Sequence, residues 1–141
     1  MRIGEIIGHR CWMVAWGEAL FGPHSRIHWR TDEPMTGKIS LDGHAGVYAF
    51  KDRATIDKVM LINSVLDPLA EEWWGPLHKD PVGLAIGTVK LWGTVWEHQI
   101  GWRAQYGRVA SIDELLMGPD FSRRHTDSPV LMRLRNKYCR F

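Results

Sequence analysis

The chain has 141 residues, of which 45% are hydrophobic and 24% charged, and its formal net charge at pH 7 is +2. This length suits one domain with its own core, so we expect a single domain over residues 1–141. No apolar run approaches the roughly 18 to 20 residues that cross a membrane, and the N-terminus lacks a signal-peptide core, so the sequence predicts a cytoplasmic protein with no membrane partner.

The first half of the chain predicts two strands and a helix. Residues 8–16 combine bulky and β-favouring side chains, which is typical of a strand. After a loop rich in Asp, Pro and Gly, residues 46–50 have the apolar character of a short buried strand. Asp52 is then placed to cap a helix that runs from Arg53 to about Val65.

The most informative segment, residues 87–107, predicts a β-hairpin with its turn at His-Gln-Ile-Gly. Because hairpins pair residues across their strands, polar and aromatic side chains are expected to crowd one end of the sheet. The residues in this group are Trp92, Trp96, Glu97, His98, Trp102 and Arg103. The chain has eight tryptophans, more than one small core needs, so some are expected at a binding surface.

The C-terminal part, residues 111–141, is expected to be helical and to pack on the sheet or extend from it. Ser111 and Glu114 have the spacing of a capping box, which predicts a short helix ending near Met117. Ser128 precedes a proline and predicts a last helix that runs to about Tyr138. Together these elements predict an α+β fold with a curved, mainly antiparallel sheet, partly open and barrel-like, and about three helices.

The usual signatures of catalysis and of cofactor binding are missing from the sequence. His24 and His28 have the separation of a helical zinc pair, but the surrounding residues do not favour a helix, and no further ligands follow at a diagnostic spacing. No serine or cysteine lies in a nucleophile elbow, and the glycines form no phosphate loop. We therefore expect no metal and no cofactor.

The remaining chemistry lies in the hairpin. Neighbouring strand residues face opposite ways, so only one of Glu97 and His98 is expected in a pocket, where it would be a candidate general base. Glu97 and Arg103 are close enough across the turn for an ion pair. That pair is either an ordinary surface contact or a device that holds the planar guanidinium toward an anionic or heterocyclic ligand.

The middle half of the chain resembles a group of small bacterial and phage proteins. These have a Gly-x-Tyr-Ala strand and a Leu-Trp-Gly…Glu-His…Gly-Tyr/Trp-Arg-Ala hairpin, which correspond here to Gly46–Ala49 and residues 87–104. Such proteins often carry Cys-Gly or Cys-x-Cys-Gly before the Tyr-Ala strand, where this chain reads Gly43-His-Ala-Gly46. The resemblance implies that the hairpin defines the fold, and it implies no known activity.

Three functions follow as hypotheses, with binding favoured over catalysis. The first is a binding module for a nucleotide, a nucleic-acid base or a similar flat anionic ligand. Its site would contain Tyr48, Trp92, Trp96, Glu97, Trp102 and Arg103. The second is a protein-interaction module, encoded by a mobile element and docking through Trp73 and Trp74. The third is a small enzyme with Glu97 or His98 as its general base.

Overall fold

The structure is a computed structural model that describes residues 2–3, 5–15, 19–21, 29–31, 33–36, 46–63, 83–117 and 123–139. Within these residues the chain forms eight strands and two helices. In chain order they are β1 (Arg2–Ile3), β2 (Ile6–Ala15), β3 (Ala19–Phe21), β4 (Met35–Thr36), β5 (Val47–Phe50), α1 (Arg53–Asn63), β6 (Gly83–Glu97), β7 (Gly101–Met117), β8 (Arg123–His125) and α3 (Pro129–Tyr138).

The described strands form one sheet in which every pairing is antiparallel. Its order is β1-β6-β2-β5-β7-β4, and β6 also pairs with β7. β6 pairs with β2, β2 with β5, β5 with β7, and β7 again with β6, so the series of pairings leads back to β6. The contact between β2 and β5 consists of one register pair, His9–Phe50. The expectation of a mainly antiparallel sheet is confirmed, while its partly open, barrel-like character stays a prediction.

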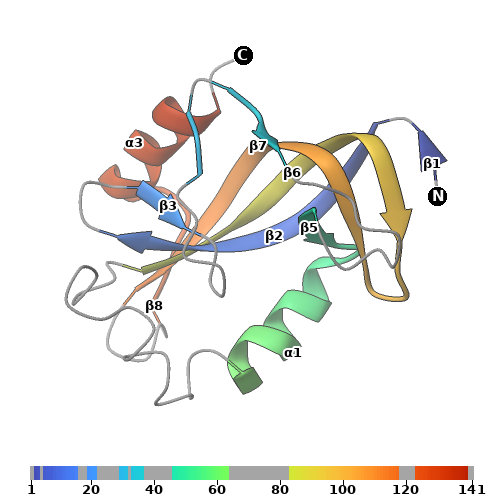
Figure 1. The fold of residues 1–141 in the computed structure, drawn as a ribbon. Helices are drawn as coiled ribbons and strands as arrows, with labels where there is room; N and C mark the ends of the chain where they lie inside the picture. The colour runs from blue at the N-terminus through green and yellow to red at the C-terminus, as the bar shows by residue number, and fades with distance from the viewer. Residues whose placement is uncertain are drawn as a thin grey trace.

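The two described helices lie on opposite sides of this sheet (Figure 1). Three residues of α3, Leu131, Leu134 and Tyr138, are buried in the main hydrophobic cluster with residues of β2, β5, β6 and β7. On the other side, Ile56 of α1 is fully buried in a smaller cluster that includes Cys11 of β2. No helix in the described part of the chain is long and apolar enough to cross a membrane.

Both helices begin as their local sequences predict. The Asp52 carboxylate accepts a hydrogen bond of 2.8 Å from the backbone N–H of Thr55 and starts α1. The Ser128 hydroxyl accepts one of 3.2 Å from the backbone N–H of Leu131 and starts α3. Side-chain caps of this kind satisfy amides that have no partner inside the helix. The strands predicted over residues 8–16 and 46–50 are confirmed in their described residues as β2 and β5.

The short helix predicted from the capping box is wrong, because residues 111–117 continue β7. Ser111 pairs with Thr88 of β6, and their hydroxyl oxygens are 2.7 Å apart. Ile112 and Leu115 are buried in the core. A capping box contributes only about 1 kcal/mol, so cross-strand pairing and burial of two large apolar side chains outweigh it.

The expectation of a helical segment over residues 111–141 is corrected accordingly. Its described residues begin with the end of β7, continue in β8, and become helical only in α3. β8 pairs with the end of β7, where Leu116 lies opposite Arg124. The described part of this segment therefore adds two strand stretches to the sheet before its one helix.

Candidate functional site

The hairpin register decides which of the predicted site residues meet. Around the turn, Trp96 pairs with Arg103, and Glu97 pairs with Trp102. β5 runs along the other edge of β7 and places Tyr48 opposite Arg103. Because directly paired residues point to the same face of a sheet, Tyr48, Arg103 and Trp96 form a row across β5, β7 and β6.

Arg103 and Tyr48 are in direct contact within this row. The guanidinium carbon of Arg103 is 4.7 Å from the centroid of the Tyr48 ring, a cation–π distance. Gly101 leaves room for that ring, since a β-carbon at position 101 would be 2.5 Å from the Tyr48 hydroxyl oxygen. Burial raises the pKa of Tyr48, while the charge of Arg103 acts in the opposite direction. The Tyr48 hydroxyl is therefore protonated at neutral pH and is available as a hydrogen-bond donor.

Glu97 and Trp102 share the other face with a residue that the sequence did not single out, Lys51. Lys51 follows β5, and its ammonium is 2.6 Å from the Glu97 carboxylate and 4.9 Å from the centroid of the Trp102 ring. Trp102 itself packs against the main hydrophobic cluster. The register places Glu97 and Arg103 on opposite faces, and among the described residues Arg103 forms no ion pair.

Trp92 and His98 lie outside the row of Tyr48, Arg103 and Trp96. Trp92 stacks on Tyr106 with ring centroids 5.8 Å apart, just before an irregularity in the β6–β7 register. His98 is half-buried in the turn, and its backbone N–H donates to the Gly101 carbonyl over 2.8 Å. The structure therefore separates the six predicted hairpin residues into smaller groups.

Two findings bear on the hypothesis of a general base. The Glu97 side chain is 49% exposed and is engaged by Lys51, whereas a general base is usually tuned by desolvation. Within the described part of the chain, no group of three or more His, Cys, Asp or Glu residues is arranged to hold a metal ion. The predicted docking residues Trp73 and Trp74 lie outside the described residues.

A further cation, Arg10 of β2, contacts the backbone of Tyr48 from the opposite face of the sheet, although no sequence motif marked it. One of its terminal nitrogens donates to the Tyr48 carbonyl over 2.5 Å, across 38 positions of sequence. Its guanidinium carbon is 4.7 Å from the ring centroid of the buried Trp29. Burial lowers the pKa of Arg10 to about 10. The contact depends on tertiary structure, so only an alternation argument on β2 could have suggested that Arg10 and Trp12 share a face.

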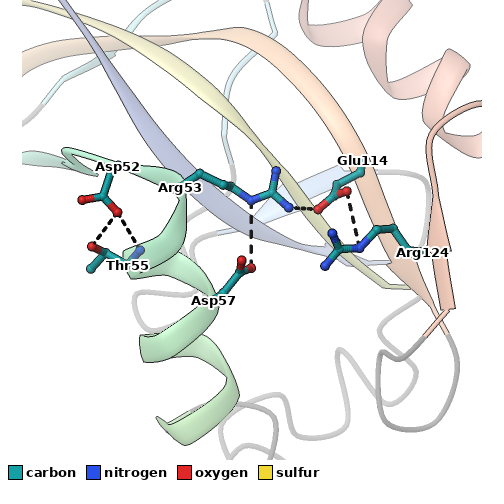
Figure 2. A network of polar contacts seen from close by, with 6 residues as sticks. All are labelled: Asp52, Arg53, Thr55, Asp57, Glu114 and Arg124. Atoms are coloured by element: carbon teal, nitrogen blue, oxygen red, sulfur yellow. Dashed lines mark hydrogen bonds and ion pairs between the residues drawn. The ribbon is translucent and has the colours of Figure 1, made fainter.

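A second polar cluster joins α1, β7 and β8 (Figure 2). Glu114, one of the capping-box residues, has a side chain that is only 8% exposed and forms ion pairs with Arg53 and Arg124. Arg53 is also within 4.0 Å of Asp57. This cluster connects elements that are distant in sequence. The carboxylates of Glu114 and Asp57 are both paired with arginine.

Comparison with protein-family models, with curated proteins and with solved structures finds no match to this chain. The resemblance to small bacterial and phage proteins therefore stays a hypothesis.

Proposed function

We propose that this protein binds a flat, anionic ligand, a nucleotide or a nucleic-acid base with its phosphate, at the turn end of the β6–β7 hairpin. The observation that carries the proposal is the row of Tyr48, Arg103 and Trp96 across three strands, with Arg103 stacked on Tyr48. Aromatic rings offer stacking faces to bases, and a guanidinium offers a planar set of donors to an anion.

The charge of Arg103 supports this role. In the described part of the chain no carboxylate pairs with Arg103, and its partner is a neutral ring. A cation–π contact holds the side chain in place but leaves its charge uncompensated. Arg103 as a whole is only half-buried, so part of the residue is open to solvent.

The other face of the same hairpin end supports the proposal less directly. Lys51 lies over the ring of Trp102, which repeats the combination of a cation and an aromatic ring. The ammonium, however, is already neutralised by Glu97 at 2.6 Å. We therefore assign ligand binding to Tyr48, Arg103 and Trp96, and we regard Glu97 as the partner of Lys51 and not of Arg103.

The test is a tryptophan-fluorescence and thermal-shift titration with the four nucleoside monophosphates and with short single-stranded oligonucleotides. Wild-type protein should respond saturably, and Arg103→Gln should weaken binding by about tenfold or more, because a charge-assisted contact is lost. Arg133→Gln is the matched control, since Arg133 is an exposed arginine on α3. α3 lies far from the β6–β7 turn (Figure 1).

Two results would contradict the proposal. One is the absence of any saturable response from folded wild-type protein. The other is equal affinity in wild type and Arg103→Gln, which would place any binding elsewhere on the molecule.

A further inference from the structure

The face that holds the proposed site continues along β6, away from the hairpin turn. Leu91 and Val95 are buried in the main hydrophobic cluster. Neighbouring residues of a strand face opposite ways, so Trp92 and Trp96, which follow them in the chain, lie on the face opposite that cluster. Trp96 already belongs to the row with Arg103. Trp92 therefore lies on the same face as that row, further along the hairpin.

Trp92 forms a second aromatic pair on this face. It lies opposite Tyr106 of β7, and the two rings are stacked with an interplanar angle of 27° and centroids 5.8 Å apart. Both residues are half-buried. Gly93 makes space for the pair, because its φ is 81° and a β-carbon there would be 2.9 Å from the Tyr106 ring. The Gln105 side-chain amide also donates to the Tyr106 hydroxyl over 3.2 Å. The stacked rings are thus fixed in place by their neighbours.

Two cations form the next row along the hairpin. Lys90 of β6 lies directly opposite Arg108 of β7. Their neighbours Leu91 and Val109 are buried in the main hydrophobic cluster. The two cations therefore lie on the opposite face, where the second aromatic pair lies. Glu5 is 3.1 Å from the Lys90 ammonium, but these side chains are 60% and 44% exposed, so the ion pair is weak. Like charges paired across strands repel, and a phosphate beside them would be favourable.

The three rows together form one strip on the β6–β7 hairpin, which we call the hairpin strip. In order from the turn, it contains Tyr48, Arg103 and Trp96, then Trp92 and Tyr106, then Lys90 and Arg108. The strands β6 and β7 run side by side along this length (Figure 1). At about 3.3 Å per residue, the strip is roughly 20 Å long from Trp96 to Lys90. That length exceeds what one nucleotide covers.

We propose that the ligand of the hairpin is a single-stranded nucleic acid of about four nucleotides or more, which lies along the hairpin strip. Its bases stack on the aromatic residues, and its phosphates meet Arg103 and the pair of Lys90 and Arg108. This inference rests on the proposed function and makes it more specific, because it names the class of ligand and adds the second aromatic pair and the row of cations. Stacking tolerates any base, so little sequence preference is expected.

The experiment measures fluorescence anisotropy of labelled thymidine oligonucleotides of increasing length. The affinity should rise until about four nucleotides and then level off, at about a hundredfold above that of thymidine monophosphate. A duplex of the same length should bind at least about tenfold more weakly, because its bases are already stacked on each other. Uridine oligonucleotides measured in parallel distinguish RNA from DNA as the ligand, and length-dependent binding of either strand supports the proposal.

Variants of the second aromatic pair separate the hairpin strip from a site for one nucleotide. Trp92→Leu should weaken binding of the longer oligonucleotides by about tenfold, because a stacking face is lost. The same variant should change the affinity for thymidine monophosphate by less than about twofold, since one nucleotide occupies the row of Tyr48 and Arg103. Trp92→Phe keeps an aromatic face and should keep most of the affinity.

A charge variant provides an independent test if Trp92→Leu does not fold, as judged by circular dichroism. Arg108→Gln should weaken oligonucleotide binding and reduce the slope of log affinity against log salt concentration by about one. Arg133→Gln is the matched control and should keep both, because Arg133 is an exposed arginine of α3 on the other side of the sheet.

The failures of the two proposals are distinguishable. If thymidine monophosphate or the duplex binds as tightly as the longest single strand, the hairpin strip is overturned as the site. The same holds if Trp92→Leu and Arg108→Gln both keep the wild-type affinity for oligonucleotides. In these cases binding of one nucleotide at Arg103 still stands. If neither nucleotides nor oligonucleotides bind, the proposed function itself is overturned.

Discussion

Two pairs of arginines in this protein have opposite surroundings. Arg53 and Arg124 converge on Glu114, which is buried between α1, β7 and β8 (Figure 2). Arg10 contacts the backbone carbonyl of Tyr48 and Arg103 contacts its ring, and the strand register places these two arginine side chains on opposite faces of the sheet. Their partners among the described residues are aromatic rings and a carbonyl, and no carboxylate. The same type of side chain is therefore paired with an acid in one region and packed against aromatic rings in the other.

The difference is one of charge balance. A buried carboxylate requires its cations, since an unpaired charge in a low-dielectric interior is strongly unfavourable. Arg103, which is half-buried over an aromatic ring, is stable enough without an acid, because water still reaches part of the residue. The first arrangement is expected to dominate stability, and the second is expected to dominate binding.

The largest expected effect is on stability in the Glu114 cluster. Arg53→Gln leaves the carboxylate buried with only Arg124, whose side chain is 56% exposed and whose Nε is 3.5 Å away. The free energy of unfolding should fall by about 3 kcal/mol, as measured by urea denaturation. Arg124→Gln is the matched control and should cost less than about 1 kcal/mol. Equal losses in the two variants would show that Glu114 does not depend on Arg53.

A second experiment removes the space for Tyr48 without touching any charge. In Gly101→Ala the new β-carbon would be 2.5 Å from the Ala49 carbonyl oxygen and 2.5 Å from the Tyr48 hydroxyl oxygen. Overpacking of this kind should cost about 2 kcal/mol and displace Tyr48 from Arg103. Urea denaturation and nucleotide titration measure the two effects. Gln99→Ala, in the exposed turn, is the control and should change neither the free energy of unfolding nor nucleotide binding. Unaltered stability in Gly101→Ala would rule out the tight contact with Tyr48.

Arg103→Gln and Arg53→Gln are expected to differ most clearly in whether they lose stability or nucleotide affinity. Loss of the stack on Tyr48 should lower the free energy of unfolding by less than about 1 kcal/mol, the usual range for a cation–π contact that is partly exposed. The same variant should lose nucleotide affinity, whereas Arg53→Gln should keep it in the folded protein. A stability loss in Arg103→Gln as large as in Arg53→Gln would mean that both arginines are structural.

The smallest expected effect concerns the cap of α1, beside the Glu114 cluster. Hydrogen bonds from the backbone N–H and hydroxyl of Thr55 lower the pKa of Asp52 below its ordinary value of 3.8. Because the pKa of Asp52 is lower in the folded state, the stability that this cap contributes is fully present above pH 3.8. It is lost as the pH falls through the lowered pKa of the folded state. Asn also caps helices and does not titrate. Urea denaturation from neutral pH to about pH 2 should therefore show a weaker acid dependence in Asp52→Asn.

Local sequence was a reliable guide wherever local interactions decide the structure. The caps at Asp52 and Ser128, the strand over residues 46–50 and the β6–β7 hairpin each depend on neighbouring residues, and each is present. The capping box at Ser111 has the same kind of signal, but there β6 and the core compete for the same residues. Local preference was overridden at that point by burial and strand pairing.

For the candidate site, the sequence by itself determined that a hairpin brings Trp96, Glu97, Trp102 and Arg103 to one turn, because strand pairing across a short turn is a local property. Only the tertiary structure decided their partners. Glu97 meets Lys51 and Glu114 meets Arg53, while Arg10 reaches Tyr48 from another strand, 38 positions earlier in the chain. Such contacts are set by how distant strands are brought into register, and the same register decides which arginines meet a carboxylate and which do not.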